Sequence, residues 1–213
     1  MPGLASRQVF HAYRPEPGPH RRAVRFCPRC GSACRRRVVG GRSRPSCRVC
    51  GFVQYDNPAP GVAVVVTRED TVLLGRRAAG STFGGRWAFP AGFIELHEDF
   101  LSAARREVKE ETGLEVVVTG IVNVTSNHFS ERFHAVVVAV AGRAVGGRLC
   151  AGDDFCEVRW IPLSGRLPPL AYEADRRLLR TLRRGPLPLL PVDPRYARGP
   201  AKAHRYGVGS AAR

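Results

Sequence analysis

The segment GFIELHEDFLSAARREVKEETGL, residues 92–114, most constrains how this chain can fold. It predicts a helix, because Asp99 can cap the N-terminus just before an apolar run and Gly113 can adopt the left-handed conformation that ends a helix. At 100° per residue the apolar side chains share one stripe, which consists of Phe100, Leu101, Ala104 and Val108. The helix is therefore expected to pack this stripe on a core.

Three glutamates, Glu107, Glu110 and Glu111, lie together on another sector of this helix. Like charges at this spacing each cost about a few tenths of a kcal/mol, and only Arg106 is placed to pair with one of them, Glu110. Clustered carboxylates with open coordination positions suit a hard divalent ion, Mg²⁺ or Mn²⁺. The alternative is a solvated acidic helix face, the usual explanation of a charge run.

The spacing of nine residues in this segment matches a known signature. Gly92 is followed after five residues by Glu98, and after seven more by Arg106-Glu107-Val108, one residue, Glu110-Glu111, one residue and Gly113-Leu114. The segment resembles the signature of the Nudix hydrolases at every fixed position. The resemblance covers about residues 58–184 and implies an α/β/α sandwich with a mixed β-sheet. It also implies hydrolysis of the pyrophosphate bond of a nucleoside diphosphate linked to another group.

The resemblance also implies roles for individual residues. Glu107, Glu110 and Glu111 would be the principal Mg²⁺ or Mn²⁺ ligands, Glu98 and the Gly92 carbonyl would be further ligands, and Arg106 would orient a glutamate. A bound cation neutralises charge on phosphate oxygens and lowers the pKa of an attacking water. Glu110 is the first choice for the base that takes the proton from water. The alternatives lie in a later loop and are Asp153, Asp154 and Glu157.

Two cysteine pairs precede this region. Cys27 and Cys30, then Cys47 and Cys50, form C-x2-C pairs separated by sixteen residues, and a glycine follows each pair. This spacing is typical of a tetrahedral zinc ribbon. Disulfides and a redox motif are the alternatives, and both are less suited to a duplicated pair in a chain without a signal peptide. Zn²⁺ is expected to hold this small module together, because the module has few large apolar residues.

The chain divides into four predicted parts. These are a disordered leader at 1–25, a zinc ribbon at 26–57, a hydrolase domain at 58–184 and a disordered basic tail at 185–213. Within the domain, apolar runs predict strands at 62–66, 71–74, 115–118, 121–124, 134–140 and 156–160, a mobile loop at 78–85, and a second helix at 172–184. Strands on both sides of the first helix predict a mixed sheet between helices.

The formal charge of +16 is distributed unevenly. Residues 1–57 carry 12 basic and 2 acidic residues, 58–172 carry 12 and 13, and 173–213 carry 10 and 3. A basic end attracts phosphates whatever its purpose, so this distribution only weakly favours a nucleic-acid partner. No apolar run is long enough to span a membrane and no signal peptide is evident, so the cytoplasm is the expected location.

Zinc ribbons ahead of Nudix domains resemble two groups: the NADH pyrophosphatases, and a group of ADP-ribose and FAD pyrophosphatase-like proteins. The first group carries a motif, SQPWPFPxS, which is absent from the corresponding stretch at 121–133. The run GRWAFPAGF favours the second group, and hence ADP-ribose, FAD or a related dinucleotide. Aromatic side chains that could stack on a substrate ring are Phe83, Phe93, Phe129 and Tyr172.

Several alternatives stay open at this stage. The chain could be an NADH pyrophosphatase, an enzyme that removes an RNA 5′ cap while the basic ribbon holds the RNA, or a non-catalytic nucleotide sensor. The sensor is disfavoured because every signature carboxylate is present. A small nucleotide substrate is the expected partner, a homodimer and a nucleic-acid partner stay open, and no membrane partner is expected.

Overall fold

The structure is a computed structural model that describes the backbone of residues 24–130 and 133–192 and the side chains of 24–127 and 133–192. Most of the predicted leader and most of the predicted tail fall outside these residues. The first elements in chain order are β1 (Cys34–Val39), β2 (Arg42–Cys47), β3 (Ala59–Arg68), β4 (Thr71–Arg77), β5 (Trp87–Ala88) and β6 (Ala91–Phe93). They are followed by α1 (Phe100–Thr112), β7 (Leu114–Ser130), β8 (Phe133–Gly147), β9 (Phe155–Pro162), α2 (Glu173–Leu182) and β10 (Leu190–Pro191).

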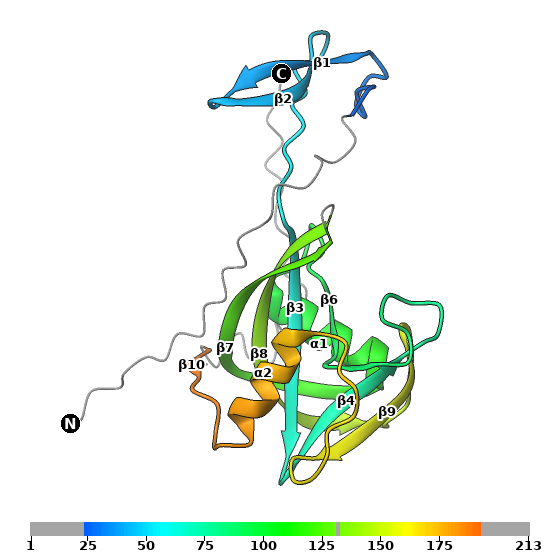
Figure 1. The fold of residues 1–213 in the computed structure, drawn as a ribbon, viewed down its shortest axis with the longest axis vertical. Coiled ribbons are helices and arrows are strands. Elements are labelled where there is room, and N and C mark those ends of the chain that lie inside the picture. The colour runs from blue at the N-terminus through cyan, green and yellow to red at the C-terminus, as the bar shows by residue number, and fades with distance from the viewer. Residues whose placement is uncertain (1–23, 131–132, 193–213) are drawn as a thin grey trace, which may run out of the picture. The chain divides into compact units, whose positions relative to one another are not determined.

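The cysteine-rich segment folds as an antiparallel hairpin of β1 and β2 (Figure 1). Gly40 and Gly41 form its turn with φ of 58° and 73°, the backbone that a tight two-residue hairpin requires. Gly31 and Gly51, which follow the two cysteine pairs, also have positive φ. The hairpin with its two cysteine turns forms a small ribbon, as predicted.

The remaining strands form one eight-stranded sheet in the order β10-β7-β8-β3-β4-β5, with β6 paired to β3 and β9 paired to β4. Strand β3 is central and its residues Val62–Val66 are fully buried, because neighbouring strands and both helices cover it. The predicted strands at 115–118 and 121–124 are one continuous strand, β7. Leu190–Pro191 pair with β7, although sequence composition predicted disorder from residue 185 onward.

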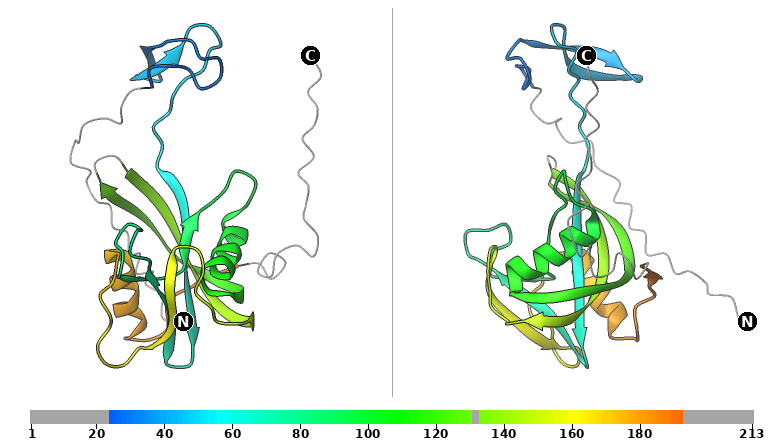
Figure 2. Two further views of the ribbon diagram at one scale, coloured as in Figure 1. Left: turned by 90° about the vertical axis from the view of Figure 1, so that its right-hand side faces the viewer. Right: turned by 180° about the vertical axis from the view of Figure 1, so that it is seen from behind.

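The two helices cover opposite faces of the sheet, as the two views of Figure 2 show. Alternate residues of a strand point to opposite faces, and β3 follows this rule. Val62, Val64 and Val66 pack in one core with α1, whereas Val65 packs in a second core that includes Leu178 and Leu179 of α2. The predicted α/β/α sandwich is therefore confirmed.

Helix α1 begins and ends where the sequence predicted. The Asp99 carboxylate accepts hydrogen bonds from the backbone N–H groups of Leu101 and Ser102, and Gly113 ends the helix at φ 71°. Helix α2 has no side-chain cap at its N-terminus. Within the part of the chain that the structure describes, no helix has the length and apolar character required to cross a bilayer.

Candidate active site

Helix α1 presents its glutamates at different depths. Glu107 and Glu111 are buried, with 6% and 1% of their surface exposed, whereas the side chain of Glu110 is 50% exposed. Carboxylate oxygens of Glu107, Glu111 and Asp153 all lie within 4.8 Å of one another. This carboxylate cluster differs from the predicted trio, because Asp153 takes the place in it that the sequence assigned to Glu110.

Burial strongly affects the ionisation of this cluster. Desolvation raises the pKa of Glu111 to about 9, although the backbone N–H of Ala91 donates to its Oε2 at 2.9 Å. Desolvation also raises the pKa of Glu107, against the opposing effect of the Arg106 guanidinium. Two buried carboxylates this close, Glu107 and Glu111, are costly to ionise together unless a cation joins them. Carboxylate oxygens are the donors that Mg²⁺ and Mn²⁺ prefer, so the residues present fit such an ion.

Arg106 pairs with one member of this cluster, Glu107, and with two neighbouring glutamates. It donates to Glu98 at 2.5 Å, to Glu107 at 2.7 Å and to Glu110 at 2.9 Å, and also to the carbonyl of Phe93. The predicted pair with Glu110 is present, and Arg106 also reaches Glu107 and, because of the fold of the loop before α1, Glu98. Hydrogen bonds from Arg106 lower the pKa of Glu98. Arg106 therefore orients three glutamates at once.

Gly92, on β6, lies directly against the cluster. A Cβ atom at this position would lie 2.1 Å from Oε1 of Glu107, so any other residue would displace that carboxylate. The pairing of Val62 with Gly92 holds β6 against β3 at this point. The glycine in the signature is thus required by the close approach of a buried carboxylate.

Only one of the three acids predicted in this loop reaches the cluster, and Glu157 lies on β9 rather than in the loop. Asp153, at φ 47°, joins Glu107 and Glu111. Asp154 instead pairs with Arg77 at 2.8 Å, and Glu157 pairs with Arg76 at 2.7 Å and also with Arg159. Sequence reasoning treated these acids alike and did not propose Asp153 as a ligand. The sequence feature that could have indicated Asp153 as a ligand was its position in a tight turn just before β9.

Asp175 of α2 is a buried acid whose position sequence reasoning missed. An acid in the first turn of a helix is expected to be exposed and to complement the helix dipole, but only 5% of Asp175 is exposed. Its Oδ2 accepts a hydrogen bond from the backbone N–H of Phe89 at 3.2 Å, and burial raises its pKa to about 7. The segment 89–91 is therefore held by a carboxylate from each helix: Asp175 at Phe89 and Glu111 at Ala91.

The candidate stacking residues are only partly brought together. The rings of Phe83 and Tyr172 meet edge to face with centroids 5.4 Å apart, and the guanidinium of Arg77 lies 5.9 Å from the Tyr172 centroid. Phe93 is 51% exposed and is not part of this pair. The side chain of Phe129 lies outside the described residues. Phe83 from the loop at 78–85 and Tyr172 at the N-terminus of α2 thus form an aromatic pair next to Arg77. Arg77 itself pairs with Asp154.

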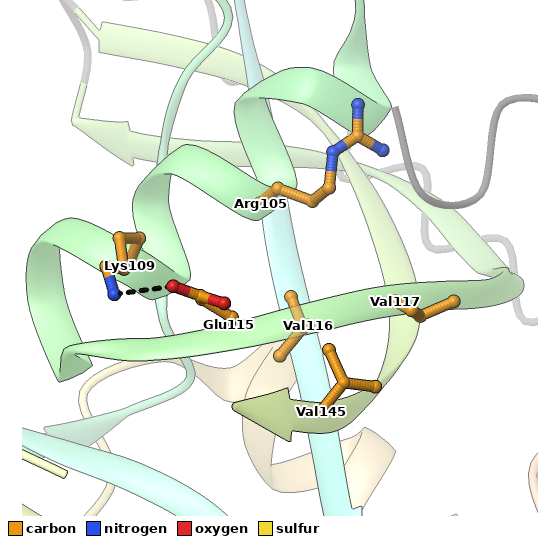
Figure 3. A pocket seen from close by; sticks show the side chains of 6 residues that line it. All are labelled: Arg105, Lys109, Glu115, Val116, Val117 and Val145. Carbon is orange, nitrogen blue, oxygen red and sulfur yellow. Dashed lines mark hydrogen bonds and ion pairs between the residues drawn. The ribbon is translucent and has the colours of Figure 1, made fainter. Parts of the chain in front are cut away.

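A groove lies on another side of α1, where Figure 3 shows Lys109 paired with Glu115 beside strands β7 and β8. Its lining residues are Arg105, Lys109, Glu115, Val116, Val117 and Val145. None of them belongs to the carboxylate cluster or to the predicted set of site residues. The groove is therefore separate from the candidate active site.

The four cysteines of the ribbon form a second cluster. Their Sγ atoms all lie within 4.8 Å of one another, with Cys27 3.5 Å from Cys50 and Cys30 3.6 Å from Cys47. These separations are too long for disulfide bonds, whereas sulfurs around a tetrahedral Zn²⁺ at about 2.3 Å are roughly 3.8 Å apart. The residues present fit zinc.

The ionisation of the cysteine thiols also points to a cation. Hydrogen bonds from Ser32 lower the pKa of Cys30 to about 6. A hydrogen bond from the Phe52 backbone lowers the pKa of Cys50, but the neighbouring thiol of Cys27, desolvation and the other thiols together raise that pKa to about 12. Four thiols this close cannot all ionise without a cation among them.

Comparison with known proteins agrees with this geometry. A family model described as NUDIX domain matches residues 57–182. An ADP-ribose pyrophosphatase from Methanocaldococcus jannaschii is 34% identical over 123 residues, which cover 57% of this chain and 72% of that protein.

A second relative is the NAD-capped RNA hydrolase NudC of Pseudomonas aeruginosa. It is 32% identical over 159 residues, which cover 74% of this chain but only 54% of NudC. The chain thus spans about half the length of this relative. Among solved structures, a NUDIX hydrolase from Nitrosomonas europaea is similar, with a TM-score of 0.64, 27% identity, and coverage of 76% of this chain and 89% of that one.

Proposed function

The chain belongs to the NUDIX domain family, and from this premise we propose that it hydrolyses the pyrophosphate bond of ADP-ribose in the presence of Mg²⁺ or Mn²⁺, releasing AMP. FAD and related dinucleotides are further candidate substrates of the same class. The relative from Methanocaldococcus jannaschii, named as an ADP-ribose pyrophosphatase, supports this choice. So does the lack of the SQPWPFPxS motif in this chain.

The carboxylate cluster of Glu107, Glu111 and Asp153 is the observation that carries the proposal. These residues, together with Glu110, would hold the divalent ion, with Glu98 and the Gly92 carbonyl as further donors. The ion would neutralise charge on the phosphate oxygens and lower the pKa of the attacking water. Arg106 would keep Glu98, Glu107 and Glu110 in position through its hydrogen bonds.

Glu110 remains our choice for the base that takes the proton from water. Its side chain is half exposed, so solvent reaches it, whereas Glu107 and Glu111 are buried. Asp153 is the remaining alternative from the loop, because it joins the carboxylate cluster whereas Asp154 and Glu157 do not. A base must lie within hydrogen-bond distance of the attacking water.

The cysteine cluster has a structural role in this proposal. Zn²⁺ held by Cys27, Cys30, Cys47 and Cys50 would fold a ribbon at 26–57, and the hydrolase domain would extend over 58–184. The family match over 57–182 agrees with that second boundary. No cysteine of the ribbon belongs to the carboxylate cluster, so zinc would not act in the reaction.

A substrate panel tests the proposal. Purified protein would be incubated with ADP-ribose, FAD, NADH, nucleoside triphosphates and sugar nucleotides, each with Mg²⁺ or Mn²⁺, and AMP or phosphate release would be measured. We expect metal-dependent AMP release with the highest kcat/KM for ADP-ribose. If no member of the panel is cleaved, the chain is better explained as a nucleotide sensor.

A second candidate function is removal of an NAD cap from RNA. The observation that favours it is the similarity to NudC, which is named as an NAD-capped RNA hydrolase. Adding an NAD-capped oligoribonucleotide to the panel distinguishes the two. A kcat/KM for the capped RNA well above that for ADP-ribose would replace our first proposal with this one.

A further inference from the structure

The ribbon hairpin displays its arginines on one face. Residues directly opposite in an antiparallel pair share a face, and alternate residues of a strand do too. The register places Arg37 opposite Arg44, Arg35 opposite Ser46, and Val39 opposite Arg42. One face of the hairpin, here called the arginine face, therefore carries Arg35, Arg37, Arg42 and Arg44.

This arrangement is unfavourable for the protein alone. Like charges directly opposite on neighbouring strands are destabilising, as for Arg37 and Arg44. None of the ion pairs found among the described residues involves an arginine of the ribbon. Four successive residues of β1, Arg35–Val38, are exposed. The arginine face thus lacks an anionic partner within the described structure.

The arginine excess of the ribbon is not shared by residues 58–172, although residues 173–213 are also basic. Residues 24–57 contain eight arginines and one acidic residue, whereas residues 58–172 of the same chain balance 12 basic against 13 acidic residues. A general preference for arginine codons would act on residues 58–172 as well, where the charges balance. The uneven distribution therefore leaves room for a local role of the arginines on the hairpin.

An exposed aromatic ring accompanies the arginines. The isolated bridge between Ser46 and Val53 extends the sheet so that Tyr55 lies beside Arg44, whose guanidinium is 4.7 Å from the ring centroid. Tyr55 is 51% exposed. The Nε atom of Arg44 is buried and has no hydrogen-bond partner among the described residues. Cationic side chains around an exposed ring form the kind of surface on which single-stranded nucleic acid binds, through phosphate contacts and base stacking.

The opposite face of the hairpin differs. There the guanidinium of Arg36 is held by the hydroxyl and the carbonyl of Ser43, and Cys47 joins the cysteine cluster. Zn²⁺ bound by four thiolates would carry net negative charge on that side. Of the two faces of the hairpin, the arginine face is therefore the one suited to bind a polyanion.

We propose that the arginine face, together with Tyr55, binds single-stranded RNA. Phosphates would pair with Arg35, Arg37 and Arg42, and a base would stack on Tyr55. RNA is the chosen occupant because the other domain has a fold that acts on nucleotide pyrophosphates, and NudC, a relative over 74% of this chain, is named for an RNA substrate. The proposal concerns binding and holds whichever pyrophosphate is cleaved.

Binding of a fluorescein-labelled oligouridylate to the full-length, zinc-loaded protein tests this proposal by fluorescence anisotropy over a range of salt concentrations. We expect the triple variant Arg35→Gln/Arg37→Gln/Arg42→Gln to bind at least about tenfold more weakly at low salt. The slope of log K against log salt should decrease by about 2, since each phosphate contact on a single strand contributes about 0.7. Tyr55→Ala should weaken binding by roughly tenfold with the slope unchanged.

A matched control removes the same charge elsewhere. Arg143, Arg148 and Arg166 are exposed arginines of the other domain, and their replacement by Gln should leave both affinity and slope unchanged. Zinc content and the circular dichroism spectrum report whether each variant is folded. An equal loss of RNA affinity in the two triple variants would show that binding depends only on net charge and would overturn the proposal. So would binding to oligodeoxythymidylate or to heparin that matches binding to RNA, or no binding by the wild type.

Discussion

The carboxylate cluster and the cysteine cluster are both candidate metal sites, but different structures hold them in place. Glu107 and Glu111 lie on a helix that packs against a large apolar core, so their positions do not depend on an ion. The cysteines lie in two turns that flank the β1–β2 hairpin, one before β1 and one at the end of β2, and residues on both faces of β1 are exposed. A site supported by a core can accept and release its ion, whereas a site without one requires its ion in order to fold.

Removing zinc should produce the largest effect. Cys47→Ser, or a zinc-selective chelator, should unfold the ribbon, because structural zinc contributes about 10–16 kcal/mol in modules of this kind. Hydrolysis should continue once excess Mg²⁺ is present. Hydrogen exchange of residues 26–54 and AMP release would be measured together. Cys150→Ser, at an exposed thiol outside the cluster, is the control. Loss of hydrolysis along with the ribbon would show that the two sites are not independent.

Glu111→Gln should have the opposite effect, a loss of hydrolysis without a loss of stability. We expect kcat/KM for ADP-ribose to fall by about 10³, since a ligand of the cation is lost. The free energy of unfolding should not decrease, because a neutral amide is easier to bury and can still accept from Ala91 N. Glu115→Gln makes the same change at a side chain that is 61% exposed and should affect neither quantity. Turnover of the Glu111 variant at the wild-type rate would remove the proposed metal site.

Gly92→Ala tests how tightly the core holds the cluster. The new Cβ would displace the Glu107 carboxylate, so activity should fall by about 10²-fold. The cost in unfolding free energy should be at the low end of the range of about 1–3 kcal/mol for overpacked sites, because the contacted atoms are the far end of the Glu107 side chain. Gly80→Ala is a suitable control, because a Cβ there meets no atom within 4 Å. Activity and urea unfolding would be compared for both variants, and equal activity in the two would contradict the close contact.

Asp175→Asn should have the smallest effect and separates burial from metal binding. The pKa of Asp175 is raised to about 7, so its neutral form is favoured in the folded state. Its contribution to stability is present below about pH 4 and is lost as the pH rises toward 7. The variant should lack this decline and be more stable at pH 8 by on the order of 1–3 kcal/mol. Urea unfolding from pH 4 to 8 measures this, and an unchanged pH dependence would contradict it. The Mg²⁺ dependence of activity should not change.

Helix α1 and the cysteine cluster were predictable from sequence because their determinants are local. A cap at Asp99, a terminal glycine at Gly113 and the spacing of two cysteine pairs each act over a few residues. Signature spacing likewise identified Glu107 and Glu111. The fold class followed from the same patterns, since apolar strands on either side of a helix require both faces of the sheet to be covered.

The features that were missed depend on contacts between distant segments. Asp153 joins the carboxylate cluster only because the turn before β9 returns to α1. The hydrogen bond of Asp175 to Phe89 spans 86 residues, so a helix-dipole role was the natural interpretation from sequence. Arg106 reaches Glu98 through the fold of the preceding loop. The partners of buried polar groups cannot be read from local periodicity.

The segment 89–91, bound by Asp175 on one side and by Glu111 on the other, has a consequence for how such a chain can diversify. Helix α2 begins beside Tyr172, so it is a natural place for changes that select a new substrate. Any such change that shifts α2 also moves the backbone that positions Glu111. New specificity in this region should therefore be acquired together with a readjustment of the proposed ion site, and successful variants should carry paired substitutions in the two helices.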